Sequence, residues 1–212
     1  NQSTDNTSEI IDSYKNKYNN IKSYVTPSHL PLVKARNFAL SMVNNSVTSP
    51  FYFAFCDADD LWEPAWLSTL MSFSDYDYDL LISNGYTLEG EIKTPYSSCL
   101  SMARPSPFNC PVSIQSCLFS SNIIENNSTF FIETFEIAYD TEFWLRRGHK
   151  LKYLHVSDYL FMYRIHENSM AQSNFLAILY ERWCMLKLHK LSLLLFLFGF
   201  LRQLKNIMFS FK

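Results

Sequence analysis

The sequence predicts an α/β fold, with a mostly parallel sheet flanked by helices and a helical tail at the C-terminus. Helix-like and strand-like segments alternate over residues 1–86, which is typical of parallel sheets. One run, 50–57 (PFYFAFCD), is continuously apolar, as expected for a strand buried on both faces. Of the 212 residues, 48% are hydrophobic and 17% aromatic, which supplies a core and argues against disorder. This length fits one domain, with or without an appendage.

The N-terminal segment predicts a turn and a helix, because polar caps at 3–5 precede apolar residues at helical spacing (Ile10, Ile11, Tyr14). A strand-like run at 21–25 follows. Residues 32–45 then predict a helix with one apolar face. Because an α/β domain rarely opens with a turn and a helix, we expect the chain to begin inside a longer domain whose first strands precede Asn1.

The remaining elements follow the same patterns. Residues 64–74 predict a helix with Pro64 in its first turn. Residues 78–86 predict a strand that ends in an Asn-Gly turn. Prolines make 87–135 irregular. The elements expected after residue 111 are a strand at 112–120, a helix at 133–150, strands at 151–157 and 159–166, and an apolar helical tail at 175–212.

Charge and cysteine content narrow the classes of partner and compartment. The net charge of −2 and the pI of about 6.2 show no basic bias, which argues against nucleic acid as the main partner. The five cysteines are scattered without a C-x-x-C pair, which favours free thiols in a reducing, cytoplasmic compartment over disulfides or a zinc site.

Three carboxylates follow the apolar run: Asp57, Asp59 and Asp60. In open α/β sheets, ligands bind beyond the carboxyl ends of the strands. Extended backbone would point Asp57 and Asp59 to one side, where they repel each other unless a cation lies between them. Oxygen ligands suit Mg²⁺ or Mn²⁺, which usually also bind substrate phosphates. The alternative is that Asp59 or Asp60 caps the following helix.

Four segments in order resemble family 2 glycosyltransferases, which have a GT-A-type, Rossmann-like nucleotide-sugar fold. They are NQSTDNTSEII (1–11), KARNFAL (34–40), FAFCDADDLWEPAWL (53–67), and AYDTEFWLRRGHKLKYL (138–154) with YRIHENSMA (163–171). The resemblance makes 1–172 a catalytic domain that lacks about one strand-helix-strand unit before Asn1. It leaves 173–212 outside as an apolar helical tail.

The resemblance implies transfer of a sugar from a nucleotide-diphosphate sugar to a hydroxyl acceptor with inversion. The acceptor would be a glycan or a lipid-linked molecule in bacterial surface glycan synthesis, such as lipopolysaccharide or capsule. Mn²⁺ or Mg²⁺ would offset charge on the leaving diphosphate. The implied roles are catalytic base for Asp140, nucleotide-sugar binding for Asp57, Arg36 and Asp5, and metal binding for Asp59 and His166.

Some positions depart from the family pattern. Tyr139 stands where an acid that helps to bind acceptors usually precedes the base, and Gln2 replaces a turn glycine. The Gln-x-x-Arg-Trp motif of processive synthases is absent, which favours single transfers. An alternative is therefore an inactive, truncated GT-A-like domain that acts as a binding or assembly module. A nucleotidyltransferase is less favoured, because the chain has only four glycines and no Gly-rich phosphate loop.

The plainer interpretations of these residues stay open. Asp140 and Arg36 fit solvated helix faces, and His166 fits an ordinary interior or loop histidine. The tail has Lys and Arg between apolar residues, which is typical of a helix lying on the inner face of a membrane. Its apolar stretch 191–201 is too short to span a bilayer, which takes about 20 residues. Packing of the tail on the domain or on a partner is the alternative.

Overall fold

The computed structural model describes residues 2–96, 106–108, 110, 112–124, 129–166, 174–194, 196–197 and 199–202. The chain divides into two compact units, Asn1–Thr48 and Ser49–Lys212.

The first unit contains two helices, α1 (Thr7–Lys17) and α2 (Leu32–Ser46). Both helices were expected from the sequence, and the bounds of α2 agree with the prediction to within one residue. The strand expected at 21–25 is wrong, because this run enters none of the described strand ladders and a lone strand has no partner for its backbone groups.

The second unit is built on a sheet whose described strands run in the order β1-β5-β3-β6-β2, and β4 pairs with the C-terminal half of β3. The strands are β1 (Tyr52–Phe53), β2 (Leu61–Trp62), β3 (Leu80–Glu89), β4 (Ile92–Tyr96), β5 (Cys117–Ser120) and β6 (Tyr153–Ile165). The α/β class is confirmed. The long central pair β3–β6 is parallel, and the other described pairs are antiparallel.

The lengths of the chain connections explain why parallel and antiparallel pairs occur in one sheet. The chain between β3 and β6 contains the helix α4 (Tyr139–Arg147), and a long crossover of this kind allows parallel pairing. The chain between β3 and β4 is a tight turn in which Gly90 has a φ of 57°, so these strands must run antiparallel.

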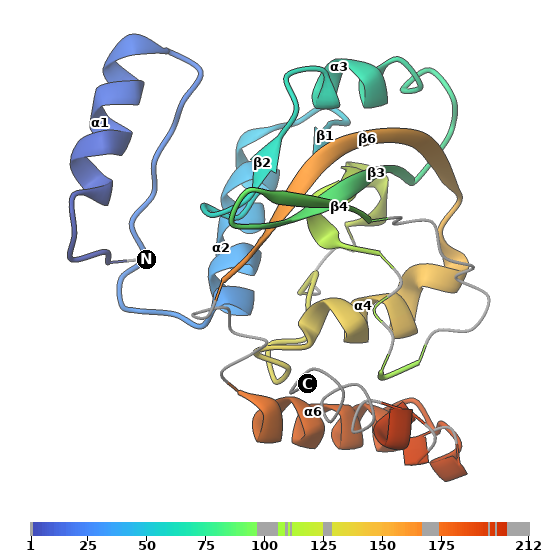
Figure 1. The fold of residues 1–212 in the computed structure, drawn as a ribbon. Helices are drawn as coiled ribbons and strands as arrows, with labels where there is room; N and C mark the ends of the chain where they lie inside the picture. The colour runs from blue at the N-terminus through green and yellow to red at the C-terminus, as the bar shows by residue number, and fades with distance from the viewer. Residues whose placement is uncertain are drawn as a thin grey trace. The chain divides into compact units, whose positions relative to one another are not determined.

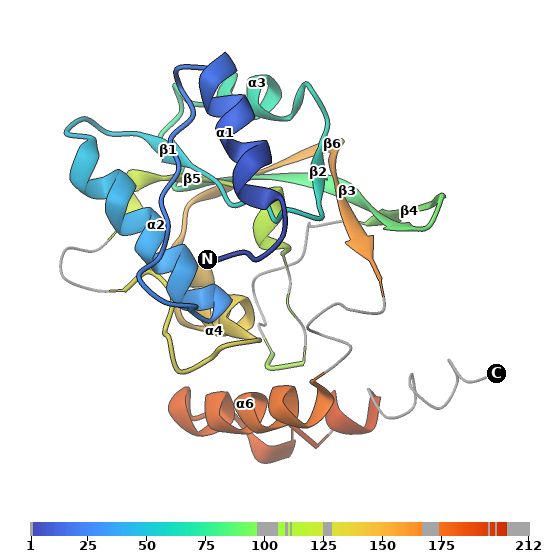
Figure 2. The same ribbon diagram turned by 90° about the vertical axis from the view of Figure 1, so that its left-hand side faces the viewer.

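The helices of the second unit form layers on the sheet (Figures 1 and 2). The short helix α3 (Trp66–Met71) lies on one side of the sheet and α4 on the other. The helix α6 (Phe175–Leu188) lies beyond α4, away from the sheet, in both views. Single 3₁₀ turns, η1 (Ile114–Ser116), η2 (Ser121–Ile123) and η3 (Gly148–Lys150), flank β5 and end α4.

The core lies on both faces of the sheet, as strand alternation requires. Leu81 pairs with Leu118 in register, and both join a buried cluster with Trp66 and Leu70 of α3. One residue along, Phe119 faces the other way and packs against rings of α4. Its partners there are Phe143, with ring centroids 5.9 Å apart, and Trp144, at 6.3 Å.

The turn expected at Asn84-Gly85 is wrong. Asn84-Gly85, expected to end a strand, lies inside β3, which continues to Glu89. The Asn84 side chain donates to the Ser157 carbonyl at 2.9 Å and contacts the ring nitrogen of His155 at 2.9 Å, across a register shift in the β3–β6 ladder. Gly85 is required because a Cβ there would collide with the ring and carbonyl of Phe161.

Candidate active site

A tight turn carries the three carboxylates. It follows β1 closely. The strand expected over 50–57 forms ladder pairs only at Tyr52–Phe53, and residues 54–57 lead from it into the turn. The Asp60 amide donates to the Asp57 carbonyl at 3.1 Å, which closes the turn. Directly after it, β2 pairs with Phe161 and Met162 of β6. The acids are therefore fixed beside the end of the long central strand.

The carboxylates of Asp57, Asp59 and Asp60 each offer one oxygen, and these three oxygens lie within 4.8 Å of one another. Asp60 is buried, Asp57 half-buried and Asp59 exposed. Such crowding of like charges at the surface of an apolar core is unfavourable unless donors or a cation offset it.

Each carboxylate is held by a different partner. The Gln115 amide Nε2 donates to Asp57 Oδ2 at 2.6 Å. The Arg164 backbone amide donates to Asp60 Oδ1 at 2.9 Å. His166 Nε2 lies 2.9 Å from Asp59 Oδ2. Two segments, η1 and the end of β6 with the residue that follows it, therefore hold the three acids.

This donor set fits a hard divalent cation. Two oxygens bound to one Mg²⁺ at about 2.1 Å lie at most about 4.2 Å apart, so the three oxygens need only a small contraction to share an ion. His166 adds an imidazole, a ligand that Mn²⁺ accepts beside carboxylates. The cluster can therefore hold a divalent ion at its exposed edge, where Asp59 lies.

The capping alternative for Asp59 and Asp60 is wrong in this structure. The residue before α3 is Ala65, and no side chain caps that helix. Instead the Trp66 amide donates to the Glu63 carbonyl at 2.8 Å. Asp60 is directed at β6 and not at α3.

Asp140 lies in the first turn of α4 and is half-buried, so it is not on a solvated helix face. Its Oδ1 accepts from the Thr141 amide at 2.6 Å, and its Oδ2 accepts from the Cys110 thiol at 3.3 Å. Burial raises the pKa of the Cys110 thiol, and the charge of Asp140 raises it further, so the thiol stays protonated as a donor.

The phenol of Tyr163 links the two groups of acids electrostatically. Burial raises the pKa of Tyr163, and the charges of Asp60, Asp59, Asp57 and Asp140 add to the shift in that order. A neutral phenol can donate a hydrogen bond. Tyr163 precedes Arg164 in β6, so it belongs to the same strand end that orients Asp60.

Sequence reasoning did not assign a role to Gln115, Tyr163 or Cys110. Gln115 and Cys110 lie in the irregular region, where no pattern marks them. Tyr163 opens the segment YRIHENSMA, which is the one signal that pointed to it.

Asp5 and Arg36 belong to the first unit. Asp5 accepts from the Thr7 amide at 3.1 Å and from the Thr7 hydroxyl at 2.5 Å, and these bonds lower the pKa of its carboxyl. Its side chain therefore stabilises the start of α1. Arg36 is buried on α2 and not on a solvated face. Nucleotide-sugar binding by Asp5 and Arg36 stays a prediction.

Comparison with known proteins gives the family. The model of the family described as glycosyl transferase family 2 matches residues 1–111, which is more than half of the chain. The match includes Asp57 and Asp59 of the acidic turn, whereas Asp140 and His166 lie beyond it. No curated protein matches the chain. The chain therefore belongs to glycosyltransferase family 2, whose members catalyse glycosyl transfer and have the GT-A-type, Rossmann-like fold.

Proposed function

We propose that this protein is a metal-dependent, inverting glycosyltransferase that moves a sugar from a nucleotide-diphosphate sugar to a hydroxyl acceptor. The observation that carries the proposal is the convergence of three carboxylates, those of Asp57, Asp59 and Asp60, beside the end of β6, with His166 in contact with Asp59. A cluster that suits Mn²⁺ or Mg²⁺ also suits a diphosphate, because these ions bind phosphate oxygens with the same preference. Asp57 and Asp59 would hold the donor through the ion.

Within this proposal, Asp140 is the general base. The Thr141 amide holds its Oδ1, and we assign proton transfer to Oδ2, whose thiol partner Cys110 is a weak donor. Oδ2 takes the proton from the acceptor hydroxyl, and the acceptor oxygen forms a bond to the anomeric carbon. The bond from that carbon to the diphosphate oxygen breaks, and the nucleoside diphosphate leaves with the electron pair. One direct displacement inverts the anomeric centre.

The divalent ion supplies Lewis-acid stabilisation of the charge on the departing diphosphate. Its ligands would be Asp57, Asp59, Asp60 and His166. We assign to Tyr163, half-buried near the same end of β6, donation to a phosphate or sugar oxygen.

A donor panel tests the proposal. The full chain is incubated with Mn²⁺, an acceptor mixture and UDP- or GDP-sugars, and release of nucleoside diphosphate is measured. We expect release with at least one donor, and loss of that release when EDTA removes the metal. Release that is unaffected by EDTA would contradict metal dependence.

Binding without turnover would favour the alternative, a GT-A-like binding or assembly module. The environment of Tyr139 supports this alternative. Tyr139, at the position where an acceptor-binding acid is usual, is buried and packs edge-on to Phe131 at 5.0 Å between ring centroids. Its side chain is part of the core and does not replace the missing acid.

We further propose that the protein works on a lipid-linked or glycan acceptor of the bacterial surface, at the inner face of the membrane. In the described part of the chain, no helix is both long and apolar enough to cross a bilayer. From residue 182 onward the sequence has no Asp or Glu. Several apolar side chains there are exposed, including Leu188, Leu193, Leu194, Leu197 and Leu201. Basic and apolar groups together suit an anionic lipid surface.

Vesicle flotation tests this contact. We expect the full chain to float with phosphatidylglycerol vesicles at low salt and to be released at high salt, because surface charge attraction is screened. Reversal of Lys187 and Lys190 to glutamate should weaken flotation, whereas the same reversal at Lys15 and Lys17 of α1 should not. A wild-type chain that stays unbound at low salt would remove the proposal.

A further inference from the structure

The helix α6 lies outside the residues matched by the family, yet it contacts the segment that carries Asp140. The carboxylate of Glu181, in the middle of α6, accepts hydrogen bonds from three consecutive backbone amides. These are Glu136 at 2.7 Å, Ile137 at 3.2 Å to either oxygen, and Ala138 at 2.8 Å. Glu181 is 8% exposed, so this contact is shielded from water.

These three amides belong to the turn that leads into α4. The residue before the helix is Ala138, whose side chain has no oxygen to accept from the first helical amides. Amides at a helix start otherwise need water or a side chain to satisfy them. Glu181, 43 to 45 residues away in the sequence, accepts instead from the amide of Ala138 and from the amides of the two residues before it, which orders the entry into the helix. Asp140 follows two residues after Ala138 in the same backbone segment.

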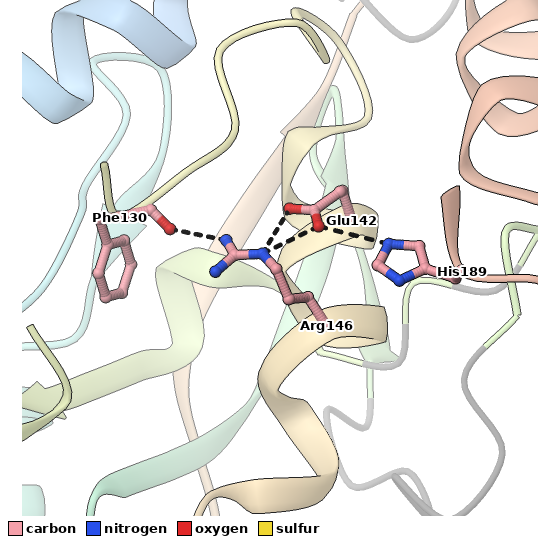
Figure 3. Close-up of polar contacts among 4 residues, drawn as sticks. All are labelled: Phe130, Glu142, Arg146 and His189. Atoms are coloured by element: carbon pink, nitrogen blue, oxygen red, sulfur yellow. Dashed lines mark hydrogen bonds and ion pairs between the residues drawn. The ribbon is translucent and has the colours of Figure 1, made fainter. Parts of the chain in front are cut away.

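A second contact joins the C-terminal end of α6 to α4. Figure 3 shows the fully buried Glu142 between the guanidinium of Arg146 and the ring of His189. Arg146 Nε donates to Glu142 at 2.9 Å, and its Nη2 donates to the Phe130 carbonyl at 3.0 Å. His189 Nε2, just after α6, lies 3.4 Å from the same carboxylate. Residues of α6 and directly after it therefore contact the turn before α4, through Glu181, and a buried carboxylate of α4, through His189.

Arg182, the next residue of α6, lies in the same region. Its guanidinium is 4.9 Å from the centre of the Phe108 ring. Burial lowers the pKa of Arg182, whereas the charge of Asp140 opposes that shift.

We propose that α6 is a working part of the glycosyl-transfer site, in which Glu181 is a positioning residue that fixes the turn 136–138 and thereby the orientation of Asp140. This role rests on the proposed function of Asp140 as base. It predicts that loss of the Glu181 charge slows turnover without weakening binding of the nucleoside diphosphate, since a small displacement of a base lowers the rate of proton transfer but leaves the metal site intact.

The test compares four variants of the full chain: Glu181→Gln, Glu181→Ala, Asp140→Asn and the control Glu136→Gln. The control makes the same chemical change in the capped turn, at a side chain that is exposed. For each variant we measure hydrogen exchange of peptides covering 133–145, the Kd for UDP or GDP with Mn²⁺, and kcat with a donor that the wild type turns over. Glu181→Gln keeps the size of the side chain and so limits damage to the fold.

For Glu181→Gln we expect exchange at 136–138 to be about tenfold faster or more, and kcat to fall by about tenfold to hundredfold. The Kd should stay within about twofold, and Glu136→Gln should match the wild type. Unchanged exchange in both Glu181 variants would overturn the capping contact. A wild-type kcat in Glu181→Gln, with Asp140→Asn inactive, would overturn the positioning role alone. If Glu181→Gln loses nucleotide binding as well as kcat, the positioning role is also overturned. Glu181 would then stabilise the fold of the second unit as a whole and not the orientation of Asp140 in particular.

Failure of the proposed function gives a different result. If Asp140→Asn keeps the wild-type kcat, Asp140 is not the base and the positioning role falls with it, whatever the exchange data show.

Discussion

Replacement of Asp59 by asparagine is expected to weaken Mn²⁺-dependent binding of UDP or GDP by about a hundredfold or more. Removal of an outer partner of a metal ligand already costs about 10- to 100-fold in metal affinity, and Asp59 would be a ligand itself. The change keeps the size of the side chain and an acceptor for His166, so it removes mainly the charge. Isothermal titration with and without Mn²⁺ measures the effect.

Asp75→Asn is the matched control, because Asp75 is an exposed aspartate of the same unit in the loop after α3. It should bind nucleotide as the wild type does. If Asp59→Asn also binds like the wild type, the ion is not held by this carboxylate and the donor site lies elsewhere.

The second large effect is expected at Asp140. Asp140→Asn should lower kcat by about 10²- to 10⁴-fold, the usual contribution of a general base, because an amide cannot accept the acceptor's proton. The oxygen that accepts from the Thr141 amide can remain, so the first turn of α4 should keep its geometry. Steady-state kinetics with the donor identified by the panel gives kcat, and titration gives the Kd of the nucleoside diphosphate.

That Kd should change by less than about twofold, because Asp140 takes no part in the metal site. Asp158→Asn, at an exposed position of β6, serves as the control and should leave both quantities unchanged. A fall in affinity as large as the fall in kcat would show that Asp140 binds the donor and is not the base.

Much of the local structure could be predicted because it depends on periodicity and caps. The α2 helix, the acidic turn after an apolar run and the helix that carries Asp140 all have such signals within a few residues of sequence. The predictions that were wrong concern the pairing and register of strands. The run 21–25 looks like a strand but finds no partner among the described strands, and Asn84-Gly85 looks like a turn but crosses a register shift beside Phe161.

The residues of the candidate site likewise fall into those that a local sequence signal marks and those that only the tertiary fold reveals. The acids at 57–60 were found from their residue types and spacing, whereas His166 was assigned through the family resemblance of its segment. Gln115 and Glu181 were not found, because each acts on a group more than 40 residues away and neither has a local pattern. Only the tertiary fold brings the Gln115 amide to Asp57 and the Glu181 carboxylate to the turn before Asp140.

The most direct test of the metal site is titration of UDP and GDP into the full chain with Mn²⁺, repeated after EDTA treatment. We predict saturable binding of at least one of the two nucleotides with Mn²⁺ and its loss with EDTA. If neither nucleotide binds in the presence of Mn²⁺, or if EDTA leaves the affinity unchanged, the carboxylates of Asp57, Asp59 and Asp60 do not form a metal-diphosphate site.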